Sequence, residues 1–67
     1  MRNSLKVERA RKNISQAELA KRLKVSRLTI HSIETGKFNP SVQLALKLAR
    51  YFNVRVEDLF ILEEEDL

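Results

Sequence analysis

The sequence predicts a small, mainly α-helical domain of five short helices, and three observations support this prediction. Serines at positions 15 and 26 directly precede amphipathic stretches, as helix N-caps do. The apolar residues of these stretches recur at helical spacing. Gly36 and Pro40 are the only glycine and proline, so the strongest break falls at one place. A length of 67 residues fits one domain, residues 1–67.

Composition argues against several classes of protein. The chain has no cysteine and a single histidine, His31, so it offers no disulfide and no zinc-binding cluster. No apolar run approaches the roughly 20 residues of a membrane span, and no secretory signal is visible. We therefore expect a cytoplasmic protein without metal, cofactor or membrane partner. A lone exposed histidine and the lack of a glycine-rich phosphate loop argue against an enzyme.

The charge is unevenly distributed along the chain, whose net charge is +4. Residues 1–37 hold ten Lys/Arg against three Glu, which gives +7. Residues 38–67 hold three Lys/Arg against six acidic residues, which gives −3. A basic half suits a polyanion such as nucleic acid, although a merely solvated charged surface is the alternative.

The first helix is predicted over residues 5–12, and the second is predicted to follow Ser15. Ser15 caps the second helix, and Glu18 three residues later completes the pattern of a capping box. Lys24 and Val25 make the turn that follows. The residues expected to face inward are Leu5, Val7 and Ala10 in the first helix, and Ala17, Leu19, Ala20 and Leu23 in the second.

The third helix is capped by Ser26, and Ile30 and Ile33 define its inner face. Gly36 fits the position that ends it. At about 100° per residue, the opposite face carries short or polar side chains. These are Leu28, His31, Ser32 and Thr35, with Arg27 on the flank.

A loop leads to the last two predicted helices. The fourth helix is capped by Asn39 or Ser41. Its apolar side consists of Leu44, Leu48, Tyr51 and Phe52. Residues 56–60 fit a short fifth helix, with Glu57 and Asp58 in the first turn, where acidic residues are favourable.

This order of parts predicts a helix-turn-helix over residues 16–35. In such a unit the second helix enters the DNA major groove while the first crosses the backbone. The first helix needs a capped N-terminus whose amides can face a phosphate. The second needs an apolar inner face and a polar outer face, and a tight turn must join the two. The sequence supplies all of these parts together.

The chain resembles the Cro/C1-type (XRE-family) helix-turn-helix domain of phage and bacterial repressors over about residues 5–60. The resemblance rests on S-Q-x-x-L-A, then V-S-R-x-T-I, then I-E-x-G-K-x-N-P-S. The short length, the NPSVQLALKLARYF run and the LF ending are similar to a compact single-domain subgroup that includes the cytolysin repressor of enterococci. The resemblance implies a five-helix, lambda repressor-like fold and a homodimer that binds operator DNA. It also implies chain ends that can pair as a small two-stranded sheet.

The same resemblance implies roles for individual residues. The base-reading positions are Arg27, Leu28 and Ser32, and the DNA-backbone positions are Gln16, Ser26, Thr29, Lys37 and Asn39. Arg9 and Glu34 match an ion pair that joins the first helix to the end of the third. Glu8 stands where the family usually has an apolar residue. Either Glu8 pairs with a neighbouring cation, or the first helix sits slightly rotated.

Each DNA role has a simpler alternative. Arg27 can pair bidentately with guanine or clamp a phosphate. Contact with a thymine methyl group would explain an exposed Leu28, and so would packing at the edge of the helix. Ser32 can contact a base or a water molecule, and Lys37 and Asn39 also fit plain turn chemistry.

The apolar residues near the C-terminus are too many for so small a core to bury. We expect residues 54–62 to form a two-fold dimer interface, with core packing as the alternative for Leu59 and Phe60. The residues of this interface are Val54, Val56, Leu59, Phe60, Ile61 and Leu62. Such a dimer would place two reading helices about 34–36 Å apart on a palindromic operator. Residues 63–66 are expected to be a solvated end.

These observations favour a sequence-specific DNA-binding transcriptional regulator, in the form of a homodimeric repressor that occludes a promoter. One alternative is an antitoxin-type regulator that binds both DNA and a toxin protein, although the chain has little length to spare for it. The other alternative is a protein-interaction module without a DNA role. Binding to duplex DNA that weakens steeply with salt would exclude this last alternative.

Overall fold

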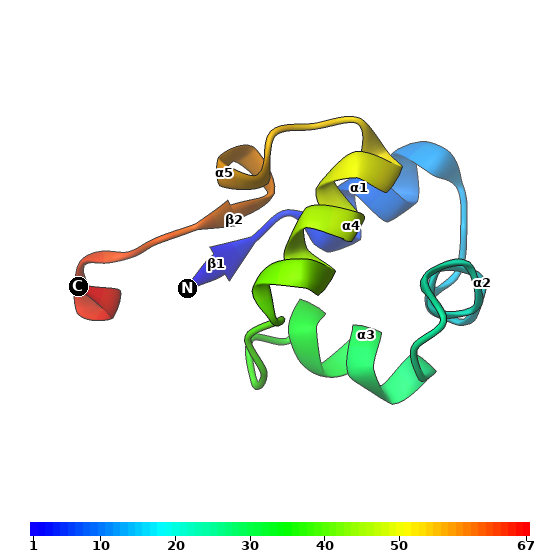
Figure 1. Cartoon of the computed structure of the whole chain (residues 1–67), viewed down its shortest axis with the longest axis horizontal. Coiled ribbons are helices and arrows are strands. Elements are labelled where there is room, and N and C mark those ends of the chain that lie inside the picture. Colours follow the sequence, from blue (N-terminus) through cyan, green and yellow to red (C-terminus); the bar gives the residue numbers. More distant parts are fainter.

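The computed structural model describes residues 1–67 as five α-helices, a two-stranded sheet and a short 3-10 helix (Figure 1). The mainly α-helical fold with a small sheet between the chain ends is therefore confirmed. In chain order the elements are β1 (Arg2–Asn3), α1 (Leu5–Lys12), α2 (Gln16–Leu23), α3 (Arg27–Glu34), α4 (Val42–Phe52), α5 (Val56–Leu59), β2 (Phe60–Ile61) and η1 (Glu64–Asp66).

Serine side chains cap α2, α3 and α4. The hydroxyls of Ser15, Ser26 and Ser41 each accept a hydrogen bond from the backbone N–H three residues on, at 3.0–3.1 Å. Ser41, and not Asn39, therefore caps α4. Each cap satisfies one of the donors that a helix start leaves unpaired.

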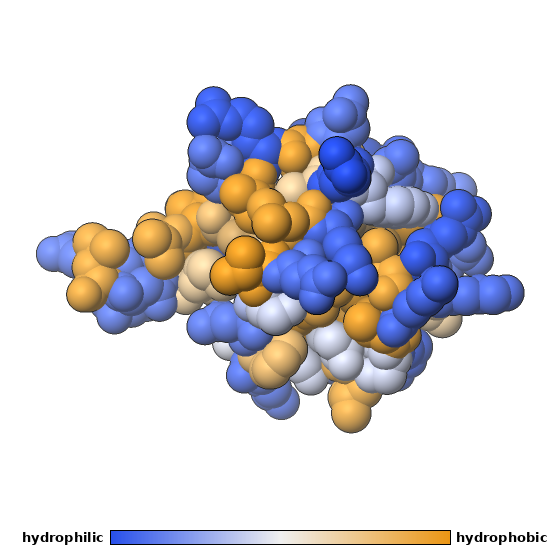
Figure 2. Space-filling view, viewed as in Figure 1, coloured by the Kyte–Doolittle hydropathy of each residue, from blue (hydrophilic) through white to orange (hydrophobic).

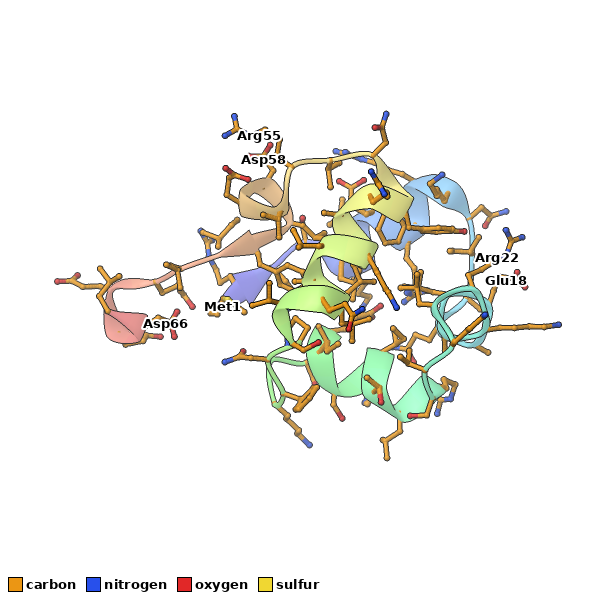
Figure 3. All side chains as sticks on the ribbon, viewed as in Figure 1. Met1, Glu18, Arg22, Arg55, Asp58 and Asp66 are labelled. Carbon is orange, nitrogen blue, oxygen red and sulfur yellow. The ribbon has the colours of Figure 1, made fainter.

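The capping box predicted for α2 is only half formed. Ser15 accepts from the Glu18 backbone as expected, but the Glu18 carboxylate accepts from Arg22 Nε at 2.9 Å. Figure 3 shows both side chains on the outer side of α2. The Glu18 carboxylate thus bonds Arg22, one turn along the helix, and not the backbone N–H of Ser15. An i,i+4 ion pair of this kind also suits helix geometry.

Left-handed residues end three of the helices and turn the chain sharply. Asn13, Lys24 and Asn53 have φ angles of 54°, 58° and 57°. Gly36, just after α3, has a φ of 79°. Lys24 allows α3 to begin with only three residues between it and α2, which makes the tight corner of the helix-turn-helix.

A single apolar core lies between the helices. Its ten buried residues are Leu5, Leu19, Ala20, Ile30, Ile33, Leu48, Ala49, Phe52, Leu59 and Phe60. The expectation that Val7, Ala10 and Ala17 face inward is wrong, since all three are exposed. Val7 and Ala17 lie about 200° around their helices from Leu5 and Leu19, so they point away from the core.

The sheet joins the two ends of the chain. Arg2 pairs with Ile61, and Asn3 pairs with Phe60, in antiparallel register. Because Phe60 is extended and belongs to β2, α5 ends at Leu59, one residue earlier than predicted. The Asn3 side chain also joins β1 to α3, since its Nδ2 donates to the Ile33 carbonyl at 2.9 Å.

The acidic C-terminus contacts the N-terminus, whereas a solvated end was expected. The Met1 amine donates to Asp66 Oδ1 at 3.2 Å (Figure 3). It also lies 3.7 Å from Glu63 Oε1. The hydrogen bond to Asp66 raises the pKa of the Met1 amine above its ordinary value, and nearby carboxylates add to the rise. The two ends of the chain thus contact each other. None of the helices has the length and apolar character needed to cross a membrane.

Candidate nucleic-acid interface

α2 and α3 form the predicted corner, with one side of α3 in the core and the other in solvent. Ile30 and Ile33 are 0% and 1% exposed. On the opposite side Arg27 and Leu28 are exposed, and Ser32 is half-buried. The three residues predicted to read bases therefore lie on the side of α3 that faces away from the core.

A chain of polar side chains runs from the first turn of α3 into the protein. Arg27 Nη1 donates to Gln16 Oε1 at 2.8 Å. Gln16 Nε2 donates in turn to Glu34 Oε1 at 3.1 Å. Glu34 also accepts from Arg9 Nε at 2.6 Å and from Arg9 Nη2 at 3.2 Å. Arg9 on α1, Gln16 on α2, and Arg27 and Glu34 on α3 are thus joined in one network.

The Arg9–Glu34 ion pair is nearly enclosed. The side chains are 17% and 5% exposed. Burial by itself raises the pKa of Glu34, but hydrogen bonds from Arg9 and Gln16 and the charge of Arg9 together lower it below its ordinary value. The hydrogen bond to Glu34 also raises the pKa of Arg9. Both groups are therefore charged near neutral pH.

Two further contacts involve arginines of α1, and one of them accounts for Glu8. Glu8 accepts from Arg11 Nη1 at 3.1 Å, so Glu8 pairs with a neighbouring cation. Arg9 also donates from Nη1 to the Ile14 carbonyl at 2.9 Å, which holds the end of α1 against the start of α2.

His31 was predicted on the outer face of the third helix, and the structure connects it to the same network. Its Nδ1 lies 3.3 Å from Gln16 Nε2. Gln16 Nε2 can only donate, so His31 Nδ1 accepts in this arrangement. No sequence motif indicated this contact, which depends on how α2 and α3 cross.

The hydroxyls at the start of α3 bond to one another. Ser26 Oγ and Thr29 Oγ1 are 2.9 Å apart, and Ser26 Oγ also accepts the Thr29 N–H at 3.0 Å. Both residues, predicted to lie on the DNA-backbone side, therefore shape the N-terminus of α3.

The loop after α3 folds back on the helix. The backbone N–H groups of Lys37 and Phe38 donate to the Ser32 carbonyl at 3.0 and 3.2 Å. Lys37 and Asn39 are exposed, as their predicted backbone role requires. Phe38 between them is 50% exposed and was absent from the predicted site. The sequence signal for it was an aromatic residue between two positions predicted to contact DNA.

The residues predicted for dimerisation divide into two groups. Leu59 and Phe60 are 0% and 9% exposed, so both belong to the core of the chain and not to its outer surface. Val54, Val56 and Ile61 are half-buried, and Leu62 is 64% exposed. Figure 2 shows hydrophobic side chains along the end of the molecule that holds the sheet. A smaller apolar surface therefore remains there than the sequence predicted.

A family profile described as helix-turn-helix matches residues 5–59. The chain belongs to this helix-turn-helix family. The predicted Cro/C1-type resemblance is confirmed. The match begins with α1 and ends with α5, so it spans the whole network from Arg9 to Glu34.

Several relatives of this helix-turn-helix protein match almost end to end. An uncharacterized HTH-type transcriptional regulator of Methanocaldococcus jannaschii is 52% identical over 66 residues, 98% of this chain and 100% of the relative. One from Archaeoglobus fulgidus is 54% identical over 67 residues, 100% of this chain and 94% of the relative. The uncharacterized HTH-type transcriptional regulator YgzD of Bacillus subtilis is 44% identical over 66 residues, 98% of this chain and 100% of the relative.

Glu34→Ala should destabilise the fold by about 3–5 kcal/mol, because it leaves Arg9 nearly buried without its charged partner. Urea unfolding of the variant and the parent measures this difference. Glu18→Ala is the matched control, since it breaks an exposed i,i+4 ion pair on α2 and should cost at most about 0.5 kcal/mol. Equal stability of the Glu34→Ala variant and the parent would show that the pair does not stabilise the fold.

The lowered pKa of Glu34 predicts a loss of stability in acid. The unfolded chain binds a proton at the ordinary Glu value of 4.5 before the folded protein does. The contribution is therefore complete above that value and is lost as the pH falls through the lowered pKa. Unfolding free energies measured from about pH 6 to about pH 3 should fall less steeply in Glu34→Gln than in the parent. Identical slopes for the two proteins would contradict the prediction.

Proposed function

We propose that this protein is a sequence-specific regulator that binds double-stranded DNA by placing α3 in the major groove. The observation that supports this most is the arrangement around Arg27. Its guanidinium stands at the exposed start of α3 and uses one donor to bond Gln16. Because a guanidinium has five donors, the others stay free for a guanine edge. Bidentate pairing of this kind is worth about 1–3 kcal/mol of discrimination.

The remaining predicted contacts fit around this anchor. Leu28 and Ser32 lie on the same outer side of α3 and are proposed to meet neighbouring bases. Gln16, at the first position of α2, is proposed to meet a phosphate through its backbone N–H, because its side-chain amide already bonds Glu34, His31 and Arg27. The other proposed backbone contacts are Ser26, Thr29, Lys37 and Asn39. Basic residues on the DNA side would supply the non-specific attraction.

The proposed active form is a two-fold homodimer that represses by covering a promoter. Its proposed interface consists of Val54, Val56, Ile61 and Leu62. Leu59 and Phe60 are left out because they are buried in the core. A closed two-fold pair uses the same surface on both copies. This arrangement would match a palindromic operator with half-sites about 34–36 Å apart.

Selection of bound duplexes from a random pool tests DNA recognition, followed by titration with salt. We expect one preferred half-site, with binding that weakens steeply as salt rises, because counterions are released from phosphates. Arg27→Ala should relax one base position, whereas Lys37→Ala should weaken all sequences about equally. No duplex binding at low salt would instead favour a protein-interaction module.

Dimerisation is tested by sedimentation of the full chain at tens of micromolar, a range that detects about micromolar association. The parent should sediment as a dimer. Leu62→Glu should shift it towards the monomer, since it places a charge in the proposed apolar contact. Leu46→Glu is the matched control, because Leu46 is another exposed leucine, on α4, outside the proposed interface. A monomeric parent would remove the dimer and its palindromic operator, without affecting recognition by a single α3.

A further inference from the structure

A shallow hollow lies where the outer side of α3 meets the loop that follows it. Ser26, Leu28, Thr29, Ser32 and Phe38 line it. Leu28 and Phe38 are 68% and 50% exposed, so the hollow has large apolar side chains from two separate elements. Three hydroxyl-bearing residues complete the lining.

The backbone places Phe38 beside α3. Gly36 adopts a φ of 79°, which reverses the chain directly after the helix. The Ser32 carbonyl then accepts the N–H groups of Lys37 and Phe38 and also the Thr35 hydroxyl, at 3.0–3.2 Å. The position of Phe38 is thus set by main-chain hydrogen bonds at the end of the reading helix. The aromatic ring does not need to be buried in the core.

The polar groups of the hollow do not distinguish thymine from cytosine. The hydroxyls of Ser26 and Thr29 bond to each other at 2.9 Å. The Ser32 hydroxyl can both donate and accept, so it can meet either O4 of thymine or the amino group of cytosine. The two bases also differ at C5, where only thymine carries a methyl group. Apolar walls respond to that difference.

We propose that this hollow binds the C5-methyl group of a pyrimidine in the major groove, with Leu28 and Phe38 as its two apolar walls. The inference rests on the proposed DNA-binding function and adds Phe38 to the specificity-determining residues. The flanking cations Arg27 and Lys37 suit the polyanion that would bring the base there. Because the methyl group is recognised rather than the polar edge, 5-methylcytosine should partly replace thymine at this position.

A uracil scan of the selected operator with the parent protein tests the proposal, since each thymine-to-uracil change removes only one methyl group. At one thymine in each half-site, uracil should weaken binding about three- to fivefold, the value expected for one buried methyl group. At that position, 5-methylcytosine should bind more tightly than cytosine by a similar factor.

The outcomes separate the two proposals. A flat uracil scan on a duplex that the protein binds specifically would overturn the methyl site and leave the DNA-binding function standing. Absence of specific binding to any duplex would overturn both.

Variants at the second wall test the role of Phe38 itself. Phe38→Ala should reduce the preference for thymine over uracil to less than half, whereas Phe38→Leu should keep most of it. Val42→Ala is the matched control, because Val42 is 77% exposed on α4 and does not line the hollow. A Phe38→Ala variant with the full preference would show that Leu28 acts without Phe38. Thermal unfolding of each variant checks that the fold is retained.

Discussion

Glu34 is the acceptor at which three helices meet. Its carboxylate lies on α3 and accepts from Arg9 on α1 and from Gln16 on α2. At 5% exposure this charge is tolerable only with its partners in place. Apolar packing of Ile30 and Ile33 holds α3 in the core, but apolar burial has no directional preference. The ion pair and the amide add direction, and so fix how α3 lies across α1 and α2.

The same network reaches the surface proposed to meet DNA. Gln16 uses its amide nitrogen towards Glu34 and its oxygen towards Arg27, so the orientation of the amide is set from inside the protein. A side chain held in place beforehand loses less conformational entropy on binding. At the other end of α3, the turn at Gly36 brings the loop with Lys37 and Phe38 against Ser32. Contacts at both ends of α3 thus define one outer surface.

Local signals in the sequence were sufficient for most of the fold. Serine caps, Gly36 and apolar spacing located α1 to α4, because caps and turns depend on neighbouring residues. Burial was harder to predict in the short helices α1 and α2, where Val7, Ala10 and Ala17 are exposed. Leu59 and Phe60 were assigned to the dimer interface because local spacing does not show how deeply the pairing of β2 with β1 buries them.

Most residues of the candidate site were predicted from the sequence, but most of the contacts between them were not. The family motif named Arg27, Gln16 and the Arg9–Glu34 pair, and the pair is present in the structure. The link from Arg27 to Gln16, the contact of His31 and the hollow beside Phe38 all depend on how α2, α3 and the loop cross. Such crossings are tertiary geometry, which residue spacing along one helix does not encode.

A double-mutant cycle on Gln16 and Arg27 tests most directly whether the network orients the reading side chain. The quantity to measure is the free-energy difference in binding between the selected operator and the same duplex changed at the base pair that Arg27→Ala relaxes. Gln16→Ala should lower this discrimination in the parent and leave it unchanged in Arg27→Ala, with a coupling energy of about 1 kcal/mol. Equal weakening of both duplexes by Gln16→Ala, with zero coupling, would contradict the role assigned to the network.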